Sequence, residues 1–253
     1  MLYTKQDTLI LSAAGCAGTD PDSLESIMTG NDAGADGCCI TVDLTADGIA
    51  VLCSQGGFSS PEGFLELREH EYFELRSAVS KIVTVGQAIE MAKCCPAKLA
   101  ITLGNTAACA AVRIALSTAD MLDRAFLCGY GLVEAARLKA QFPTLHIVGD
   151  IADTPQRPAA VVRAARETGL FGIRGRPECL TPELIEECCQ SGLITVSTET
   201  SDIDTIERLI SLGVTCIETS RPDRAYSFLP AHSAASREAG FTAPPDDTEL
   251  WNQ

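Results

Sequence analysis

Residues 34–54 read GADGCCITVDLTADGIAVLCS, and this stretch decides the fold. Two apolar runs, 37–42 and 49–53, are separated only by a short polar segment that contains Asp47-Gly48, a dipeptide typical of hairpin turns. A crossover helix needs a dozen or more residues, so the two runs cannot be parallel neighbours joined by a helix. The stretch therefore predicts a strand that extends beyond its sheet, turns and returns antiparallel to itself.

Outward from this hairpin, short β-like runs alternate with helix-like segments along most of the chain. The runs are 8–14, 37–42, 99–104, 125–130, 146–151, 170–175, 193–198 and 214–219. Between them, apolar residues recur three and four positions apart, as in 203–210, which is the helical period. Alternating strands and helices predict a parallel sheet, and eight repeats in 253 residues predict closure into a (β/α)8 TIM barrel.

Residues typical of helix ends support the predicted helix positions. Thr181-Pro182 and Asp20-Pro21 each place a capping side chain before a proline, which predicts that helices begin there. Gly192 and Gly213 lie where the following helices should end.

The stretch 55–80 has no strand–helix rhythm and is interpreted as a small excursion on the C-terminal face of the barrel. A helix resumes in KIVTVGQAIEMAK, residues 81–93. We expect residues 1–232 to form a single barrel domain. Residues 233–253 are acidic and contain prolines, so they predict an extended tail in which Trp251 is a candidate for docking on a surface.

Composition excludes several classes of protein. Thirty-four acidic residues against nineteen Lys and Arg give a formal net charge of −15, which repels nucleic acid. No apolar run approaches the ~20 residues that span a bilayer, so we expect no membrane insertion. The twelve cysteines fall inside apolar runs and lack a CxxC spacing, which predicts reduced, packed thiols and a cytoplasmic location. The AAGC before residue 17 is similar to a lipoprotein cleavage box, but its apolar stretch, 9–14, is too short for a signal peptide.

The order of elements resembles the glycerophosphodiester phosphodiesterase family. That family's second strand and hairpin, G-A-D-x-I-E-x-D-V-x-x-T-x-D-G, resembles residues 34–48, and its I-P-T-L-x-E-x-L resembles 82–89. Its L-G-V-D-G-I-x-T-D-R-P-D is similar to 212–223. The likeness extends over about residues 8 to 230 and implies the same (β/α)8 barrel.

The same register implies a loss of the family's chemistry. Members cleave phosphodiesters with a divalent metal, Mg²⁺ or Ca²⁺, held by carboxylates, and with two histidines as acid and base. Here alanines fall on the first histidine and the arginine, a cysteine and a threonine on the strand-two carboxylates, a serine on the second histidine, and a threonine on a later metal-binding glutamate. These residues are Ala13, Ala14, Cys39, Thr41, Ser54 and Thr102. The resemblance thus implies a catalytically inactive relative without a metal or other cofactor.

Other residues offer alternatives at the barrel mouth. Asp150, Glu199 and Glu218 lie near the carboxyl ends of predicted strands, and Arg174 is the basic residue expected to reach the mouth. An arginine there binds a phosphate or carboxylate in a bidentate manner, or pairs with an acid at the rim, and both interpretations remain open.

The remaining candidates for chemistry are weaker. His146 opens a strand and belongs at the opposite end of the barrel, His232 follows the last helix, and His70 lies in the excursion. A soft-metal cluster of Cys16, Cys39 and Cys53 is less favoured than simple packing.

Three functions follow as hypotheses. The leading one is a pseudoenzyme with the phosphodiesterase fold that binds a small phosphorylated or anionic ligand or has a regulatory role. The second is a divergent active phosphoric diester hydrolase of glycerophospholipid metabolism, with groups relocated around Asp150, Arg174 and Glu199. The third is a structural or interaction scaffold. The sequence is compatible with a homo-oligomer.

Overall fold

The computed structural model describes residues 8–95 and 97–228 of the 253-residue chain. Eight parallel strands lie in the order β7-β6-β2-β1-β11-β10-β9-β8. Their bounds are β1 Leu9–Ser12, β2 Gly37–Leu44, β6 Lys98–Leu103, β7 Ala125–Cys128, β8 Val148–Asp150, β9 Gly172–Gly175, β10 Ile194–Ser197 and β11 Cys216–Thr219. Parallel bridges from Leu127 to Ile147 and from Gly131 to Asp150 join the two outer strands of this order. The eight strands predicted from the sequence thus form a nearly closed (β/α)8 barrel.

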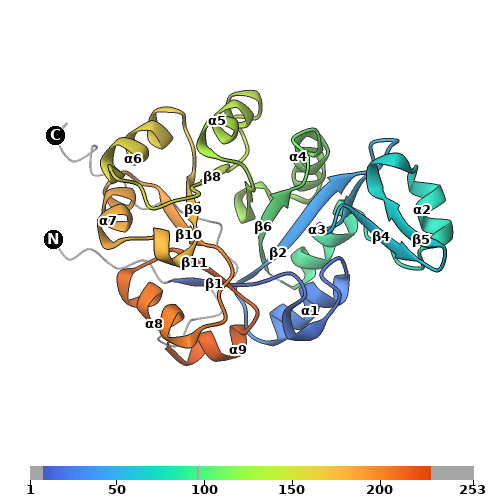
Figure 1. The fold of residues 1–253 in the computed structure, drawn as a ribbon, viewed down its shortest axis with the longest axis horizontal. Helices are drawn as coiled ribbons and strands as arrows, with labels where there is room; N and C mark the ends of the chain where they lie inside the picture. The colour runs from blue at the N-terminus through green and yellow to red at the C-terminus, as the bar shows by residue number, and fades with distance from the viewer. Residues whose placement is uncertain (1–7, 96, 229–253) are drawn as a thin grey trace.

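Helices follow the strands and surround the barrel (Figure 1). Their bounds are α1 Leu24–Asp32, α3 Val85–Cys94, α4 Ala108–Ala119, α5 Leu132–Gln141, α6 Pro158–Glu167, α7 Pro182–Gln190, α8 Ile203–Leu212 and α9 Pro222–Ala225. Short 3-10 turns span Cys16–Gly18, Leu67–Glu69, Leu122–Arg124, Pro177–Cys179 and Tyr226–Phe228. None of the helices in the described ranges has the length and apolar character needed to cross a membrane.

The predicted hairpin is confirmed. β3, Ala50–Leu52, pairs antiparallel with the end of β2 in the register Val42 to Leu52. Gly48 in the turn has φ 81°, a left-handed value that glycine adopts without strain. β2 therefore extends beyond the barrel and returns, as Figure 1 shows at its right side.

The excursion has regular structure that the sequence analysis did not predict. β4, Gly57–Ser60, and β5, Gly63–Glu66, form an antiparallel ribbon, and α2, Tyr72–Ala78, follows it. We call residues 57–78 the lobe. The lobe packs on a small core of its own, which consists of Val51, Cys53, Leu67, Leu75 and Ile82.

Helix ends agree with the predicted caps in most places. The Thr181 hydroxyl accepts a hydrogen bond from the Leu184 amide at 3.3 Å, and Gly213 ends α8 with φ 81°. The prediction that a helix begins at Asp20-Pro21 is wrong. Asp20 instead accepts from the amide of Asp22 in a turn, and Ser23 caps α1. A serine three residues later competes for the same role, and its cap fixes the start.

The strands separate two apolar cores. Inside the barrel lies a cluster of Leu11, Cys39, Ala100, Phe126, Cys128, Val148, Ile194, Val196 and Cys216. The larger core lies between the strands and the helices and contains Cys38. The neighbouring thiols of Cys38 and Cys39 thus face opposite sides of β2, as strand alternation predicts.

All twelve cysteines are free, and nine of them are buried. Cys39 lies inside the barrel, Cys53 in the lobe core, and the Cys16 thiol contacts the Ser26 carbonyl of α1. The three sulfur atoms therefore lie in three separate environments, which contradicts the alternative of one soft-metal cluster. His232, Trp251 and the predicted tail 233–253 lie outside the described residues, and the extent 1–232 of the barrel domain stays a prediction.

Candidate functional site

Three charged side chains converge at the carboxyl-terminal mouth of the barrel: Asp150 of β8, Arg174 of β9 and Glu218 of β11. Val148 and Cys216, two residues before the two acids, belong to the barrel interior. Because side chains alternate along a strand, both carboxylates also face inward. The arginine and Asp150 are register partners on adjacent strands, which brings them side by side.

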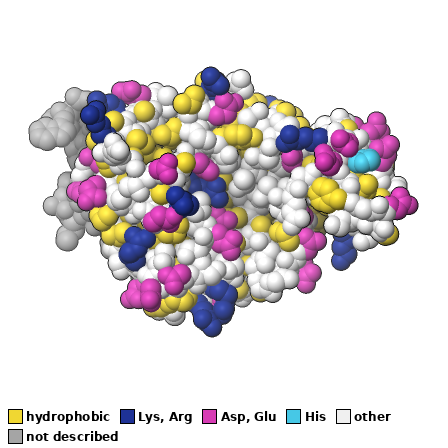
Figure 2. Space-filling model, in the orientation of Figure 1, with side chains coloured by type: hydrophobic (Ala, Val, Ile, Leu, Met, Phe, Trp, Pro, Cys, Tyr) yellow, Lys and Arg dark blue, Asp and Glu magenta, His cyan; other side chains and the backbone are white. Residues whose placement is uncertain are grey.

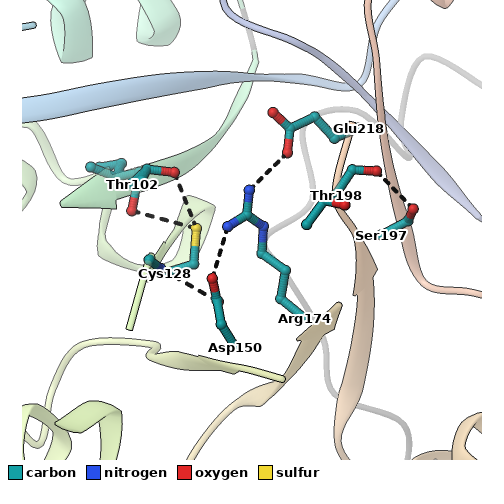
Figure 3. A network of polar contacts seen from close by, with 9 residues as sticks. Thr102, Cys128, Asp150, Arg174, Ser197, Thr198 and Glu218 are labelled. Carbon is teal, nitrogen blue, oxygen red and sulfur yellow. Dashed lines mark hydrogen bonds and ion pairs between the residues drawn. The ribbon is translucent and has the colours of Figure 1, made fainter. Parts of the chain in front are cut away.

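The guanidinium of Arg174 bridges the two carboxylates (Figure 3). One terminal nitrogen donates to Asp150 Oδ2 at 3.0 Å, and the other donates to Glu218 Oε2 at 3.2 Å. The side chains of Arg174 and Glu218 are each 14% exposed, and that of Asp150 is 28% exposed. This triad, two acids and one base, has a formal charge of −1 when both acids are ionised, and it remains in contact with solvent.

Burial dominates the electrostatics of the triad. It raises the pKa of Asp150 and of Glu218 above their ordinary values, and the Arg174 charge opposes part of that rise. The charge of Glu199 raises the pKa of Glu218 further. Burial lowers the pKa of Arg174, but the charges of its neighbours, Glu218 and Asp150 among them, outweigh burial and raise it, so the guanidinium stays protonated. The pair of acids is therefore easier to protonate than exposed carboxylates are.

Two thiols complete the polar wall of the mouth. Cys39 donates a hydrogen bond to Glu218, and burial raises the pKa of this thiol well above its ordinary value. The Cys128 sulfur lies 3.5 Å from the Thr102 hydroxyl, and burial raises the pKa of Cys128 to about 11. Since the thiolate is the nucleophile, these protonated thiols are weak ones.

The strand positions singled out by the family resemblance lie toward the carboxyl ends of β1, β2 and β6, at this mouth. Cys39 faces the interior, and Thr41 and Thr102 are register partners one alternation further along β2 and β6. Ala13 is buried just after β1, and Ala14 next to it is half-buried.

Ser54 follows β3, and its amide and hydroxyl both donate to Asp22 Oδ2 in the loop after β1, at 3.0 and 3.1 Å.

Sequence reasoning missed one contact between the lobe and the barrel rim. Arg68 donates to Asp43 Oδ2 at 3.1 Å and to the Gly104 carbonyl at 3.0 Å. Asp43 follows Thr41 by two residues, so alternation along β2 predicts that it faces inward. No comparable pattern marks Arg68, which lies 25 residues away in the stretch without periodicity.

Of the predicted ligand-binding residues, the structure joins Arg174 and Asp150 and leaves Glu199 exposed beyond β10. Arg174 therefore forms salt bridges with acids at the rim, which is one of its two predicted roles. Anion binding, the other role, stays a prediction. His146 opens the segment that leads into β8 and stacks on Phe171, away from the mouth, with ring centroids 4.2 Å apart. His70 pairs with Glu74 in the lobe at 3.6 Å.

The donor set at the mouth does not fit the divalent metal that the family resemblance implies. Mg²⁺ and Ca²⁺ require several oxygen ligands, mostly carboxylates. The two carboxylates here are bound to a guanidinium, whose positive charge repels a dication, and the nearby thiols are poor ligands for hard ions. Over the described ranges, no group of three or more His, Cys, Asp or Glu side chains is arranged to hold a metal.

Comparison with solved structures finds proteins of the same fold. A glycerophosphodiester phosphodiesterase from Parabacteroides distasonis superposes with a TM-score of 0.72 and 19% identity, covering 88% of this chain and 97% of that one. The chain has the fold of a glycerophosphodiester phosphodiesterase. The resemblance in fold that the sequence motifs implied is thus confirmed.

Two further structures of the phosphodiesterase fold agree. A phosphodiesterase from Oleispira antarctica, in complex with the product sn-glycerol-3-phosphate, gives a TM-score of 0.75 at 16% identity over 88% of this chain and 96% of that one. A glycerophosphodiester phosphodiesterase from Thermotoga maritima gives 0.73 at 16% identity, over 87% and 97%. The sequence matches no protein-family model and no curated protein.

Proposed function

We propose that this chain is a non-hydrolytic protein built on the phosphodiesterase fold, whose barrel mouth uses the Arg174 guanidinium where a hydrolase of the family would use a divalent cation. The observation that carries the proposal is the bridge from Arg174 to Asp150 and Glu218. A guanidinium supplies positive charge to an anion but cannot generate a hydroxide nucleophile from bound water, which is a main task of a catalytic metal.

The groups that would move protons also support this proposal. The family's two histidine positions correspond to Ala13 and Ser54, which have no basic side chain. His70 pairs with Glu74 in the lobe, and His146 stacks on Phe171. Because nucleophile, base and charge stabiliser act as a unit, loss of several costs nearly all of the activity. The role left to the mouth is binding of a small anionic or phosphorylated ligand, or regulation through such binding.

One observation favours the second candidate, a divergent hydrolase. Asp150 and Glu218 are buried carboxyls with raised pKa values at a barrel mouth, which is how many catalytic acids are arranged. In that case one acid would donate a proton to the leaving group, and Arg174 would bind the phosphoryl oxygens. Both ion pairs of the triad would then have to open during each turnover.

Hydrolysis assays of the purified chain separate these candidates. The substrates are bis(p-nitrophenyl) phosphate and glycerophosphocholine, each with Mg²⁺, with Ca²⁺ or with a chelator. The proposal expects rates equal to those of buffer in every condition. Turnover that disappears with Glu218→Gln would overturn it, whether or not the chelator abolishes it. Turnover that survives both Glu218→Gln and Arg174→Met comes from outside the mouth and would equally contradict a non-hydrolytic protein unless it separates from the chain on further purification.

A further inference from the structure

Two apolar side chains, one in the lobe and one in the turn between β2 and β3, are exposed. Phe73 is 74% exposed on α2, whereas Leu75, two residues later, is fully buried in the lobe core. Ile49, in the turn between β2 and β3, is 39% exposed. Single exposed apolar residues are ordinary on protein surfaces, so exposure by itself indicates nothing. The surroundings of Phe73 and Ile49 decide their interpretation.

Backbone contacts hold these two segments together. The Tyr72 amide donates to Asp47 Oδ1 at 3.0 Å, and the Ala46 amide donates to the His70 carbonyl at 3.0 Å. The turn between β2 and β3 therefore lies against the first turn of α2. The rings of Tyr72 and Phe73 meet edge to face with centroids 5.7 Å apart. We call Ile49, Tyr72 and Phe73, with the acids Asp47, Glu71 and Glu74, the tip.

Acidic groups surround the tip. Glu71 and Glu74 are exposed and flank Phe73 in the sequence, and they form the capping box of α2. A hydrogen bond from the Thr45 hydroxyl lowers the pKa of Asp47, so this carboxylate stays ionised. The arginines near the tip are fewer than its acids. Arg68 is turned toward Asp43 at the barrel rim, His70 lies 3.6 Å from Glu74, and Arg76 is exposed in the last turn of α2. Figure 2 shows acidic side chains around hydrophobic ones over the lobe, at the right of the view.

The negative charge of the tip favours a positively charged partner. A second copy of the chain would bring like charges together, and an anionic membrane surface would repel the tip as well. A segment that carries Lys or Arg beside an apolar side chain meets both requirements. Its cation would pair with Glu71 or Glu74 or lie over an exposed ring, and its apolar side chain would cover Phe73.

We propose that the tip is a docking surface for a basic, amphipathic segment of another protein. This inference goes beyond the proposed function, because the tip lies on α2 and the turn between β2 and β3, not at the barrel mouth (Figure 1). Hydrolysis assays therefore do not bear on it, and a failure of either proposal leaves the other standing.

Fluorescence anisotropy of a labelled synthetic peptide of alternating Lys-Lys and Leu-Leu pairs tests the proposal at physiological ionic strength. Phe73→Ala removes the aromatic anchor, and Glu71→Gln/Glu74→Gln removes two charges while amide oxygens keep the capping box. Val133→Ala is the matched control, since Val133 on α5 is 71% exposed but its neighbour Glu134 is paired with Arg137. We expect Phe73→Ala to weaken binding by about fivefold or more, as loss of an interface anchor does.

The charge variant should weaken binding and flatten its salt dependence, and Val133→Ala should leave it unchanged. Equal effects of Phe73→Ala and Val133→Ala would overturn the proposal, since binding would then be non-specific attraction to an acidic protein. Two further results would overturn it in favour of another occupant. These are self-association that Phe73→Ala abolishes, and binding to phosphatidylserine vesicles that Phe73→Ala abolishes. If Phe73→Ala proves unfolded by circular dichroism, the charge variant decides by itself.

Discussion

Arg174 and Asp150 are register partners on adjacent parallel strands, and their side chains meet at 3.0 Å inside the barrel mouth. Adjacent strands lie about 4.8 Å apart, so two inward residues at one level are forced into contact. Glu218 completes the arrangement from β11 at 3.2 Å. The mouth thus contains its own cation and its own counter-ions, fixed by the strands rather than by mobile loops.

Loss of the bridging cation should destabilise the fold. Arg174→Met leaves two partly buried carboxylates without their partner, and breaking a buried ion pair costs about 3–5 kcal/mol. Because the mouth retains contact with solvent, we expect a loss below that range, about 2–3 kcal/mol of unfolding free energy. Urea denaturation measures it. Arg221→Met is the control, since Arg221 pairs with Asp223 on the surface and should cost less than about 1 kcal/mol. Equal losses would contradict a structural role for the triad.

Acid should favour the folded state through Glu218. Burial raises the pKa of Glu218 above its ordinary value of 4.5, so the folded chain keeps the proton to a higher pH than the unfolded chain. Between those two values the folded state binds more protons, and stability falls as pH rises. Wild type should therefore gain stability relative to Glu218→Gln as pH falls from neutral toward 4.5.

Asp202 provides a control of opposite sign for this pH dependence. Hydrogen bonds from Thr205 lower the pKa of Asp202 below its ordinary value of 3.8. Its contribution is present above that value and is lost as pH falls through the lowered one, so wild type should lose stability relative to Asp202→Asn in acid. Urea midpoints measured from neutral pH to below 3.8 cover both trends, and trends of the same sign would refute the assignment.

The barrel and its hairpin could be predicted because both depend on local pattern. Asp47-Gly48 between two apolar runs predicts β2 and β3, and alternation predicts the separation of Cys38 from Cys39. The lobe was missed because β4 and β5 are four residues each and only partly covered, so they lack the buried alternation that marks a strand.

The candidate site was predicted only in part. Asp150 and Arg174 were found because each lies near the end of a predicted strand. Which acid pairs with Arg174 depends on strand order and inward orientation, and Glu199 and Glu218 are equivalent in sequence terms. Glu218 is the inward one, since Cys216 two residues before it lies in the barrel interior. Tertiary register, which no local pattern contains, makes that choice.

Close packing of strands should make Gly172 intolerant of a side chain. A Cβ on this residue would lie 2.4 Å from the Ile194 carbonyl oxygen on the neighbouring strand, and backbone cannot move aside cheaply. We expect Gly172→Ala to cost about 2–3 kcal/mol, the upper range for overpacking. In Gly86→Ala the Cβ would meet nothing within 4 Å, and the helix should gain about 0.5 kcal/mol. Thermal denaturation distinguishes a loss from a gain.

Anion binding at the mouth should strengthen in acid. At neutral pH the triad has a net charge of −1, and both terminal nitrogens of Arg174 are occupied by carboxylates. The raised pKa values of Asp150 and Glu218 let both groups protonate at a higher pH than exposed carboxylates do, which changes the triad to +1 and frees a guanidinium suited to an oxyanion. Sulfate is the appropriate probe, because its own charge is constant over this range.

Titration calorimetry should detect weak sulfate binding at neutral pH and increasing affinity as pH falls. Glu218→Gln removes one competing carboxylate and should move the onset of binding to higher pH, whereas Arg174→Met should abolish binding at every pH. Acid also lowers the negative charge of the whole chain, so a general electrostatic effect would strengthen sulfate binding in all three proteins alike. A shift of the onset in Glu218→Gln together with its loss in Arg174→Met locates the anion at the triad, and a common pH profile in the three proteins would refute that location.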